Sequence, residues 1–340
     1  MKTVGKIILR TIITLIVLVL VLVGVIFGLR WYNGSKYTIT QAAANARNDS
    51  QYQTTDEIVR IREGAVIGYR FTPRMRLHPG TVVVYGGSEG SPNYRQAKAI
   101  HEQGYEVLAL YFWGQEGQQP SLANVPLDQF TEVEKYIEAH VDHPRPITVI
   151  GSSKGAEFAA ELAAHGFGVD NLVNFAPADH AYGGLVYDYQ AFHPSFTYQG
   201  SPVPFASFEK LEPADSSEVM WAMLTNYPPS YRKMYEVAAK NAAADSKIDL
   251  TSFKGHALFF AGDKDAMWPG DVAAKTLAAQ SDSFEAHVFP NAGHIFSEDL
   301  DKLGTGWEIS FGGTAEGGAT AFAESNRILY ERLATWHGSM

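Results

Sequence analysis

Cysteine is absent from this 340-residue chain. Its absence excludes disulfide bonds, thiolate metal sites and a cysteine nucleophile, so any covalent catalysis must use another side chain. A basic run is lacking too: the formal net charge is −10 and the Lys and Arg residues are scattered. This charge distribution argues against nucleic-acid binding.

Motifs for metal ions and nucleotides are also missing. The chain has 11 histidines, but no H-E-x-x-H or other close spacing of metal ligands, so we expect no metal. The stretch from Gly64 to Gly68 is too short for a phosphate loop and lacks its lysine. We therefore expect no cofactor.

Charge is missing from residues 11–29, which are strongly apolar. About 19 residues at roughly 1.5 Å per residue span about 28 Å, close to the thickness of a bilayer core. We therefore expect a transmembrane anchor. The alternative is a cleaved signal peptide, but its apolar region would be shorter, and the alanine run at residues 42–44 lies too far downstream for its cleavage site.

The charges on either side of this span predict its orientation. Lys2, Lys6 and Arg10 precede it, whereas Arg30 and Lys36 follow it. The slight basic excess favours a cytoplasmic tail at residues 1–10, with the rest of the protein outside the cell membrane. Residues 30–55, rich in Ala, Asn, Gln, Ser and Thr, show no clear apolar period and are expected to form a tether.

Short apolar runs alternate with amphipathic stretches over residues 56–340, the pattern of a mostly parallel sheet covered by helices. The expected strands are residues 66–71, 81–85, 106–111, 147–150, 172–175, 257–260 and 285–289. The expected helices are residues 94–103, 127–139, 156–164, 272–280 and 321–333. Residues 179–250 interrupt the alternation with an insertion that contains six prolines, and we expect it to form a lid.

The strongest sign of chemistry is the sequence Gly-Ser-Ser-Lys-Gly at residues 151–155. It follows a predicted strand and precedes a predicted helix, which is the context of the G-x-S-x-G turn. Such a turn strains the backbone of its serine and exposes the hydroxyl, so Ser153 is the candidate nucleophile. The alternative is a glycine-rich turn with an incidental serine, and the motif alone does not separate the two.

A second glycine-rich loop follows the strand predicted at residues 81–85. It reads Gly86-Gly87-Ser88-Glu89-Gly90. Beside a nucleophilic serine, such a loop donates a backbone N–H to the developing oxyanion. We expect one donor at Lys154 and the other at Ser88, with Gly87 nearly as good a choice. The alternative is an ordinary β-turn.

An acid and a base follow the last two predicted strands. Asp265 lies on a turn after residues 257–260 and would orient an imidazole, with Asp263 as the competing carboxylate. His294 follows residues 285–289 and would take the proton of Ser153. The chain order Ser, Asp, His is that of α/β-hydrolases. We therefore predict an α/β-hydrolase fold with a lid insertion, preceded by a single transmembrane helix.

Several longer stretches resemble those of one particular protein family. They are residues 85–90 (YGGSEG), 125–127 (VPL), 151–157 (GSSKGAE), 196–200 (FTYQG), 202–205, 231–233, 262–269 (GDKDAMWP) and 312–314 (GGT). Through them the chain resembles, over roughly residues 80–333, the carboxyl-terminal domain shared by acyl-CoA thioesterases and bile acid-CoA:amino acid N-acyltransferases. The resemblance implies that Ser153, Asp265 and His294 hold the nucleophile, acid and base positions.

Two differences from that family bear on the expected function. Many members place cysteine at the nucleophile position, whereas this chain has Ser153, which favours hydrolysis without excluding acyl transfer. Full-length animal relatives also carry an amino-terminal β-sandwich domain, of which residues 56–79 could form a remaining hairpin. A membrane span takes the place of that domain here.

The expected function is a serine hydrolase that cleaves small-molecule acyl thioesters or esters through an acyl-enzyme on Ser153. The alternatives are acyl transfer to an amine or hydroxyl, and a membrane-tethered binding domain without catalysis. The sequence leaves the oligomeric state open. Aromatic residues of the insertion, Phe205 and Trp221 among them, are expected to line the acyl pocket or, alternatively, to pack the lid's own core.

Overall fold

The computed structural model describes residues 2–39, 48–186 and 192–340, and its centre is an eight-stranded sheet with the order β1-β2-β4-β3-β6-β7-β10-β11. The strands are β1 Ile58–Glu63, β2 Val66–Phe71, β3 Thr81–Tyr85, β4 Glu106–Leu110, β6 Ile147–Ser152, β7 Asn171–Phe175, β10 His256–Gly262 and β11 Phe284–Phe289. Pairing is parallel from β4 through to β11 and antiparallel where β2 meets β1 and β4. The predicted mostly parallel sheet is confirmed, and all seven predicted strands lie within two residues of their expected bounds.

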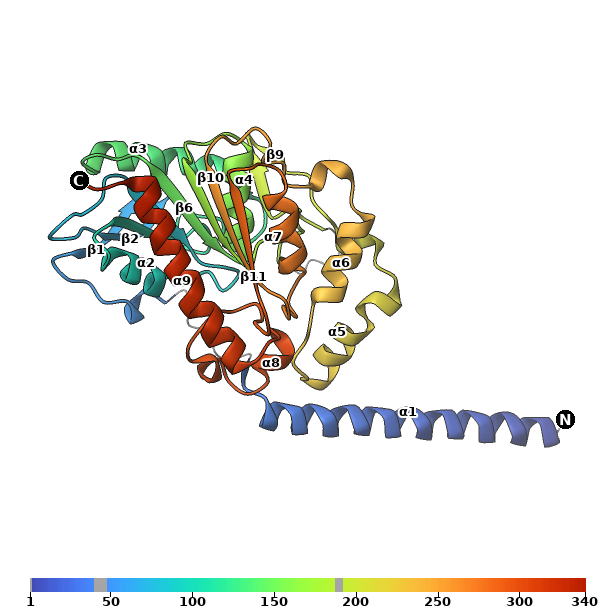
Figure 1. Ribbon diagram of the computed structural model, residues 1–340. Coiled ribbons are helices and arrows are strands. Elements are labelled where there is room, and N and C mark those ends of the chain that lie inside the picture. The colour runs from blue at the N-terminus through green and yellow to red at the C-terminus, as the bar shows by residue number, and fades with distance from the viewer. Residues whose placement is uncertain (1, 40–47, 187–191) are drawn as a thin grey trace.

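Side chains of the strands alternate between two apolar layers, because successive residues of a strand point to opposite faces. In β3, Val83 and Tyr85 join one layer, and Val82 and Val84 the other. The first layer is covered by α3, α4 and α7, and the second by α2 and α9, which crosses the front of the sheet in Figure 1. These helices are α2 Tyr94–His101, α3 Phe130–His140, α4 Lys154–Ala164, α7 Gly270–Ala278 and α9 Ala315–His337. All five predicted helices are present.

Residues 56–79 contain the expected hairpin, formed by β1 and β2. It belongs to the central sheet, because β2 pairs with β4 and β1 forms the edge of that sheet. In β1 only Ile58 and Ile61 are buried, and the charged side chains between and after them face solvent. This sparse apolar spacing explains why the sequence does not predict β1 as a strand.

The insertion at residues 179–250 contains two helices and part of a small second sheet. The helices are α5 Pro213–Thr225 and α6 Arg232–Asn241, and the sheet joins β5 Val125–Pro126, β8 Phe196–Tyr198 and β9 Ser201–Pro202. The start of α5 is set by Pro213 in its first turn and by a reciprocal capping box between Glu212 and Asp215. One further short helix, α8 Trp307–Ser310, precedes α9.

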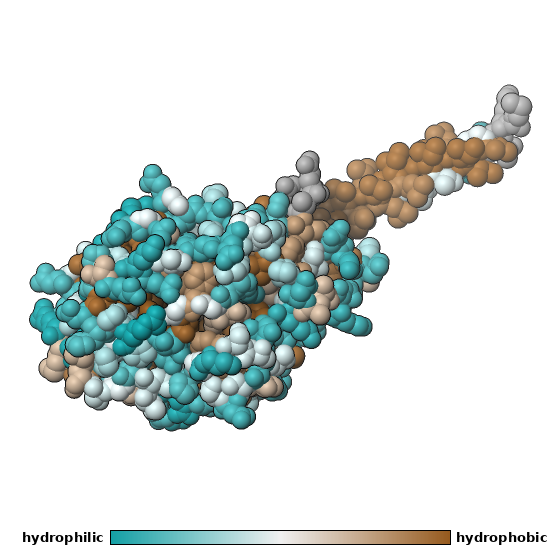
Figure 2. Space-filling view, turned by 90° about the horizontal axis from the view of Figure 1, so that it is seen from above, coloured by the Kyte–Doolittle hydropathy of each residue, from teal (hydrophilic) through white to brown (hydrophobic). Residues whose placement is uncertain are grey.

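The first helix, α1 Lys2–Lys36, projects from the body as an apolar rod (Figures 1 and 2). Its most apolar window has a mean hydropathy of 3.3, and none of that window is buried. The helix is long and apolar enough to span a membrane.

Residues 30–55 do not form a free tether in the parts that the structure describes. The Asn33 side chain is buried and donates to the carbonyl oxygen of Thr225 at 2.9 Å. Ile39 is buried against Leu300 and Trp307. The sequence does not predict these contacts, because they are made by isolated residues without an apolar period. Residues 40–47 of the predicted tether lie outside the described residues.

Candidate active site

Ser153 lies on a strained turn between β6 and α4, as the G-x-S-x-G motif predicts. Its φ of 54° and ψ of −120° are unfavourable for a residue with a Cβ, and its side chain is half-buried. A Cβ on Gly155 would lie 1.9 Å from the carbonyl oxygen of Gly86, and one on Gly151 would lie 2.1 Å from that of Gly155. Both glycines are therefore required for the strand, the turn and the helix to pack this closely.

A chain of two hydrogen bonds joins the three predicted side chains. The Nε2 atom of His294 is 2.9 Å from Oγ of Ser153, and its Nδ1 atom is 2.8 Å from Oδ2 of Asp265. The structure thus brings together residues from the ends of β6, β10 and β11 that are up to 141 positions apart. A serine, an imidazole and a buried carboxylate in this order can activate the hydroxyl as a nucleophile.

Asp265 is held as a buried acceptor. Only 1% of it is exposed, and its Oδ1 accepts from the backbone N–H groups of Met267 at 2.8 Å and Trp268 at 3.2 Å. These bonds leave Oδ2 for the imidazole. Asp263, the competing carboxylate, instead accepts from the backbone N–H of Asn291 at 2.7 Å and braces the turn that leads to His294.

The carbonyl oxygen of Phe311 connects the acid loop to the base loop. It accepts from the backbone N–H of His294 at 2.8 Å and from that of Ala266 at 3.2 Å. The next residue, Gly312, has a φ of 75°, and a Cβ there would lie 1.8 Å from the carbonyl oxygen of Lys264. The sequence shows Gly312 only as part of a family stretch, so this role is found from the structure.

The loop after β3 lies beside the nucleophile. A Cβ on Gly87 would lie 3.1 Å from Cβ of Ser153, whereas Ser88 is exposed. The backbone N–H of Gly87 donates to the carboxylate of Glu89 at 3.0 Å, which also accepts from Ser91 Oγ at 2.6 Å. Of the two residues considered for the second oxyanion donor, the structure therefore places Gly87 next to Ser153. The sequence does not predict the carboxylate of Glu89 at this position.

The side chain of Lys154, the residue after Ser153, is fully buried. Its Nζ is 2.8 Å from Oε2 of Glu157 and 2.8 Å from Oγ of Ser195, and 3.3 Å from the carbonyl oxygen of Gly183. Burial raises the pKa of Glu157 to about 7 and lowers the pKa of Lys154, while their mutual attraction opposes both shifts. This charged side chain ties the first part of the insertion to α4.

The predicted pocket residues lie apart from each other. Phe205 is half-buried against the main core, 3.6 Å from a Cβ placed on Gly183. Trp221 lies on the outer face of α5 and is 47% exposed, so in this structure it does not line an enclosed pocket. Other lid aromatics pack a small core of their own: Tyr182 and Tyr235 contact Trp268, whose ring is 5.7 Å from that of His294.

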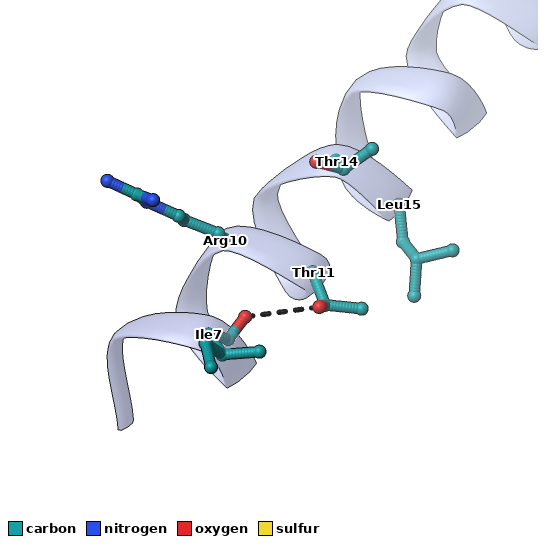
Figure 3. A pocket seen from close by; sticks show the side chains of 5 residues that line it. All are labelled: Ile7, Arg10, Thr11, Thr14 and Leu15. Carbon is teal, nitrogen blue, oxygen red and sulfur yellow. Dashed lines mark hydrogen bonds between the residues drawn. The ribbon is translucent and has the colours of Figure 1, made fainter. Parts of the chain in front are cut away.

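A shallow hollow on α1 is unrelated to these residues. It is lined by Ile7, Arg10, Thr11, Thr14 and Leu15, all from one helix, and Thr11 Oγ1 donates to the carbonyl oxygen of Ile7 at 3.1 Å (Figure 3). Among the residues that the structure describes, no three His, Cys, Asp or Glu side chains are grouped to hold a metal ion.

The sheet order, the turn at Ser153 and the positions of Asp265 and His294 define an α/β-hydrolase. A family model described as "BAAT / Acyl-CoA thioester hydrolase C terminal" matches residues 125–298, more than half of the chain. The chain belongs to this family.

Two relatives that match over most of this chain share about a quarter of its residues. The chain is 24% identical over 262 residues to bile acid-CoA:amino acid N-acyltransferase of Mus musculus, covering 72% of this chain and 55% of that protein. It is 27% identical over 248 residues to acyl-coenzyme A thioesterase 6 of Mus musculus, covering 69% and 53%. It therefore spans about half the length of these relatives. An esterase of Pyrococcus furiosus aligns in structure with a TM-score of 0.48 and 13% identity, covering 85% of this chain and 93% of the esterase.

We predict that replacing glycine by alanine destabilises the protein strongly at Gly312 and only slightly at Gly200. Gly312→Ala should lower the free energy of unfolding by about 3 kcal/mol or more, because its Cβ meets a carbonyl oxygen and its φ is positive. It should also lower turnover, since His294 and Asp265 are held through this segment. Gly200 has nearly the same φ, 76°, and open space around it, so Gly200→Ala should cost only about 1 kcal/mol. Chemical denaturation and ester turnover measure both effects, and equal losses from the two variants would contradict the prediction.

Proposed function

We propose that this chain is a membrane-anchored serine hydrolase that cleaves acyl thioesters or esters through an acyl-enzyme on Ser153. The observation that carries the proposal is the unbroken hydrogen-bond chain from Ser153 through His294 to the buried Asp265. A domain that only binds a ligand has no physical need for these three matched groups, and so catalysis is favoured over a silent binding role.

The proposed first step is attack of Ser153 Oγ on the acyl carbonyl carbon. The Nε2 atom of His294 takes the hydroxyl proton across 2.9 Å, and Asp265 fixes the tautomer and stabilises the imidazolium that forms. The imidazolium then gives the proton to the departing thiolate or alkoxide. Water attacks the acyl-enzyme in a second cycle, in which His294 again acts first as base and then as acid.

The developing oxyanion needs two donors. In our proposal they are the backbone N–H groups of Lys154, in the first turn of α4 where such groups have no partner within the helix, and of Gly87. Because Gly87 donates to Glu89 in the structure, the substrate oxygen must displace that carboxylate. The backbone N–H of Ser88 is the alternative second donor.

Acyl thioesters are the first substrate class to test, because the relatives are named for acyl-coenzyme A. The presence of N-acyltransferases among them keeps acyl transfer to an amine or hydroxyl as a second candidate. Adding glycine to the reaction separates the two. Release of free acid alone supports hydrolysis, and formation of N-acylglycine supports transfer.

The proposed domain organisation has a tail at residues 1–10, an anchor at 11–29, a connecting segment at 30–55 and a hydrolase domain at 56–340 with its lid at 179–250. The exposed apolar surface of α1 supports the anchor. The slight basic excess before the span supports an extracytoplasmic catalytic domain.

Ser153→Ala should abolish turnover of acyl thioesters and esters and leave the melting temperature close to that of the wild type, because the hydroxyl is not part of the core. The matched control is Ser152→Ala, which should stay active. A fluorophosphonate probe should label the wild type and the control but not Ser153→Ala. If Ser152→Ala were inactive and Ser153→Ala active, the nucleophile would be Ser152 and the assignment to Ser153 would be wrong.

Asp265→Asn should leave the fold nearly unchanged and lower kcat by about three to four orders of magnitude, because the imidazole loses the partner that fixes its tautomer. Asp263→Asn is the control, since this carboxylate braces a turn and does not touch the imidazole. Similar losses from both variants would show that Asp265 is not the acid of the triad.

Protease added to intact cells should remove the hydrolase domain, because the proposed orientation places it outside the cell membrane. Immunodetection of the domain before and after treatment measures this. Protection of the domain in intact cells, with cleavage only after lysis, would reverse the orientation.

A further inference from the structure

The outer face of α5 is apolar although it lies on the surface. Met220, Met223 and Leu224 recur at helical spacing and, with Trp221 beside them, are 47–58% exposed. The inner face, which includes Val219, Ala222 and Thr225, is buried against the body. A helix that is apolar on both faces needs an apolar neighbour on each side, and within residues 2–39, 48–186 and 192–340 only the inner face has one.

Charged side chains are kept off this outer face. At about 100° per residue, the two acidic residues of α5, Asp215 and Glu218, point away from the outer apolar side chains, and Glu218 is exposed. The outer face continues toward the helix start with Pro213, Ser216 and Ser217, which are uncharged. Four large apolar side chains on an uncharged helix face form a patch that suits an apolar partner.

The position of α5 identifies that partner, because its carboxyl end is fixed to α1. Arg30 donates through Nη1 to the carbonyl oxygens of Met223 at 3.0 Å and Leu224 at 3.3 Å, and Asn33 donates to that of Thr225. Asn226 in turn donates to the carbonyl oxygen of Arg30 at 3.4 Å. Arg30 is the first residue after the charge-free segment 11–29, so these bonds hold α5 at one end of the apolar rod (Figure 1).

We infer that the outer face of α5 lies in the surface of the same lipid bilayer that α1 spans, an inference that rests on the proposed anchor. Large apolar and aromatic side chains of α1 are exposed as well, among them Phe27 on the rod and Trp31 and Tyr32 at its base, next to the residue that binds the carboxyl end of α5. Tryptophan and tyrosine favour the membrane interface, and short amphipathic helices bind there through their apolar face. A protein partner bound to the outer face of α5 would have to lie against the exposed apolar span of α1 as well.

This contact joins the active site to the membrane. The segment after α5 is bonded to the acid loop: Ser230 Oγ donates to the carbonyl oxygen of Ala266 at 2.7 Å, and Arg232 Nη1 to that of Asp265 at 3.0 Å. The helix that rests on the bilayer is thus one short segment away from the carboxylate that orients His294. The membrane contact therefore holds the lid in a fixed position relative to the lipid surface.

Site-directed spin labelling tests the inference in the full-length chain, and the absence of cysteine makes each label unique. Met220→Cys, Met223→Cys and Leu224→Cys report on the outer face, Glu218→Cys is the control on the same helix, and Phe27→Cys reports on the span. Each variant carries a nitroxide in a nanodisc of phosphatidylcholine and phosphatidylglycerol. Power saturation then compares collisions with oxygen, which concentrates in lipid, and with a nickel chelate, which stays in water.

Oxygen collisions should exceed nickel collisions at Met220, Met223, Leu224 and Phe27, and the order should reverse at Glu218. Nickel access at all three outer positions, with Phe27 in lipid, overturns the α5 contact and leaves the span intact. Nickel access at Phe27 overturns the anchor and the α5 contact together. Labels on α5 that are shielded from both reagents would mean that protein covers the face, which also overturns the inference. All five positions are exposed, so the substitutions should not disturb folding, and circular dichroism verifies this.

Discussion

The close approach of two backbones next to Ser153 is the contact on which the rest of the site depends. With only 1.9 Å between an added Cβ on Gly155 and the carbonyl oxygen of Gly86, α4 can start this close to the end of β3 only if residue 155 is glycine. The same contact sets Gly87 against the side chain of Ser153. The position of the hydroxyl and that of the neighbouring backbone N–H are therefore fixed together, before any acid or base is considered.

The acid and base reach Ser153 through a second set of backbone contacts. Parallel pairing of β10 with β11 starts their two following loops side by side, but β7 separates them from β6. The loop after β11 must pass over the ends of β10 and β7 to bring His294 to Ser153. The carbonyl oxygen of Phe311, which accepts from His294, and the carboxylate of Asp263, which accepts from Asn291, hold it in that path. Three neighbouring loops are thus fixed mainly by main-chain bonds, which leaves Oδ2 of Asp265 and both nitrogens of His294 for each other and for Ser153.

Much of this arrangement is predictable from sequence because it depends on local patterns. Continuous apolar runs such as residues 81–85 predict buried parallel strands, and a serine between glycines after a strand predicts the turn at Ser153. Contacts made through backbone atoms carry no such signal. The carbonyl oxygen of Phe311 and the N–H of Gly87 are common to every residue, so their partners appear only in three dimensions. The edge strand β1 and the packed segment around Asn33 are not predicted, because their few buried residues do not recur with the spacing of a strand or a helix.

The buried Lys154 side chain fixes the first part of the insertion to α4. Its Nζ donates to the carbonyl oxygen of Gly183 and to Oγ of Ser195, which holds both residues against α4. The strand β8, which follows Ser195, also pairs with β5. Moving Gly183 and Ser195 away would take two oxygen acceptors from a buried ammonium group, so this part of the insertion is held against α4. We therefore expect Gly183, Ser195 and α4 to keep their relative positions during turnover.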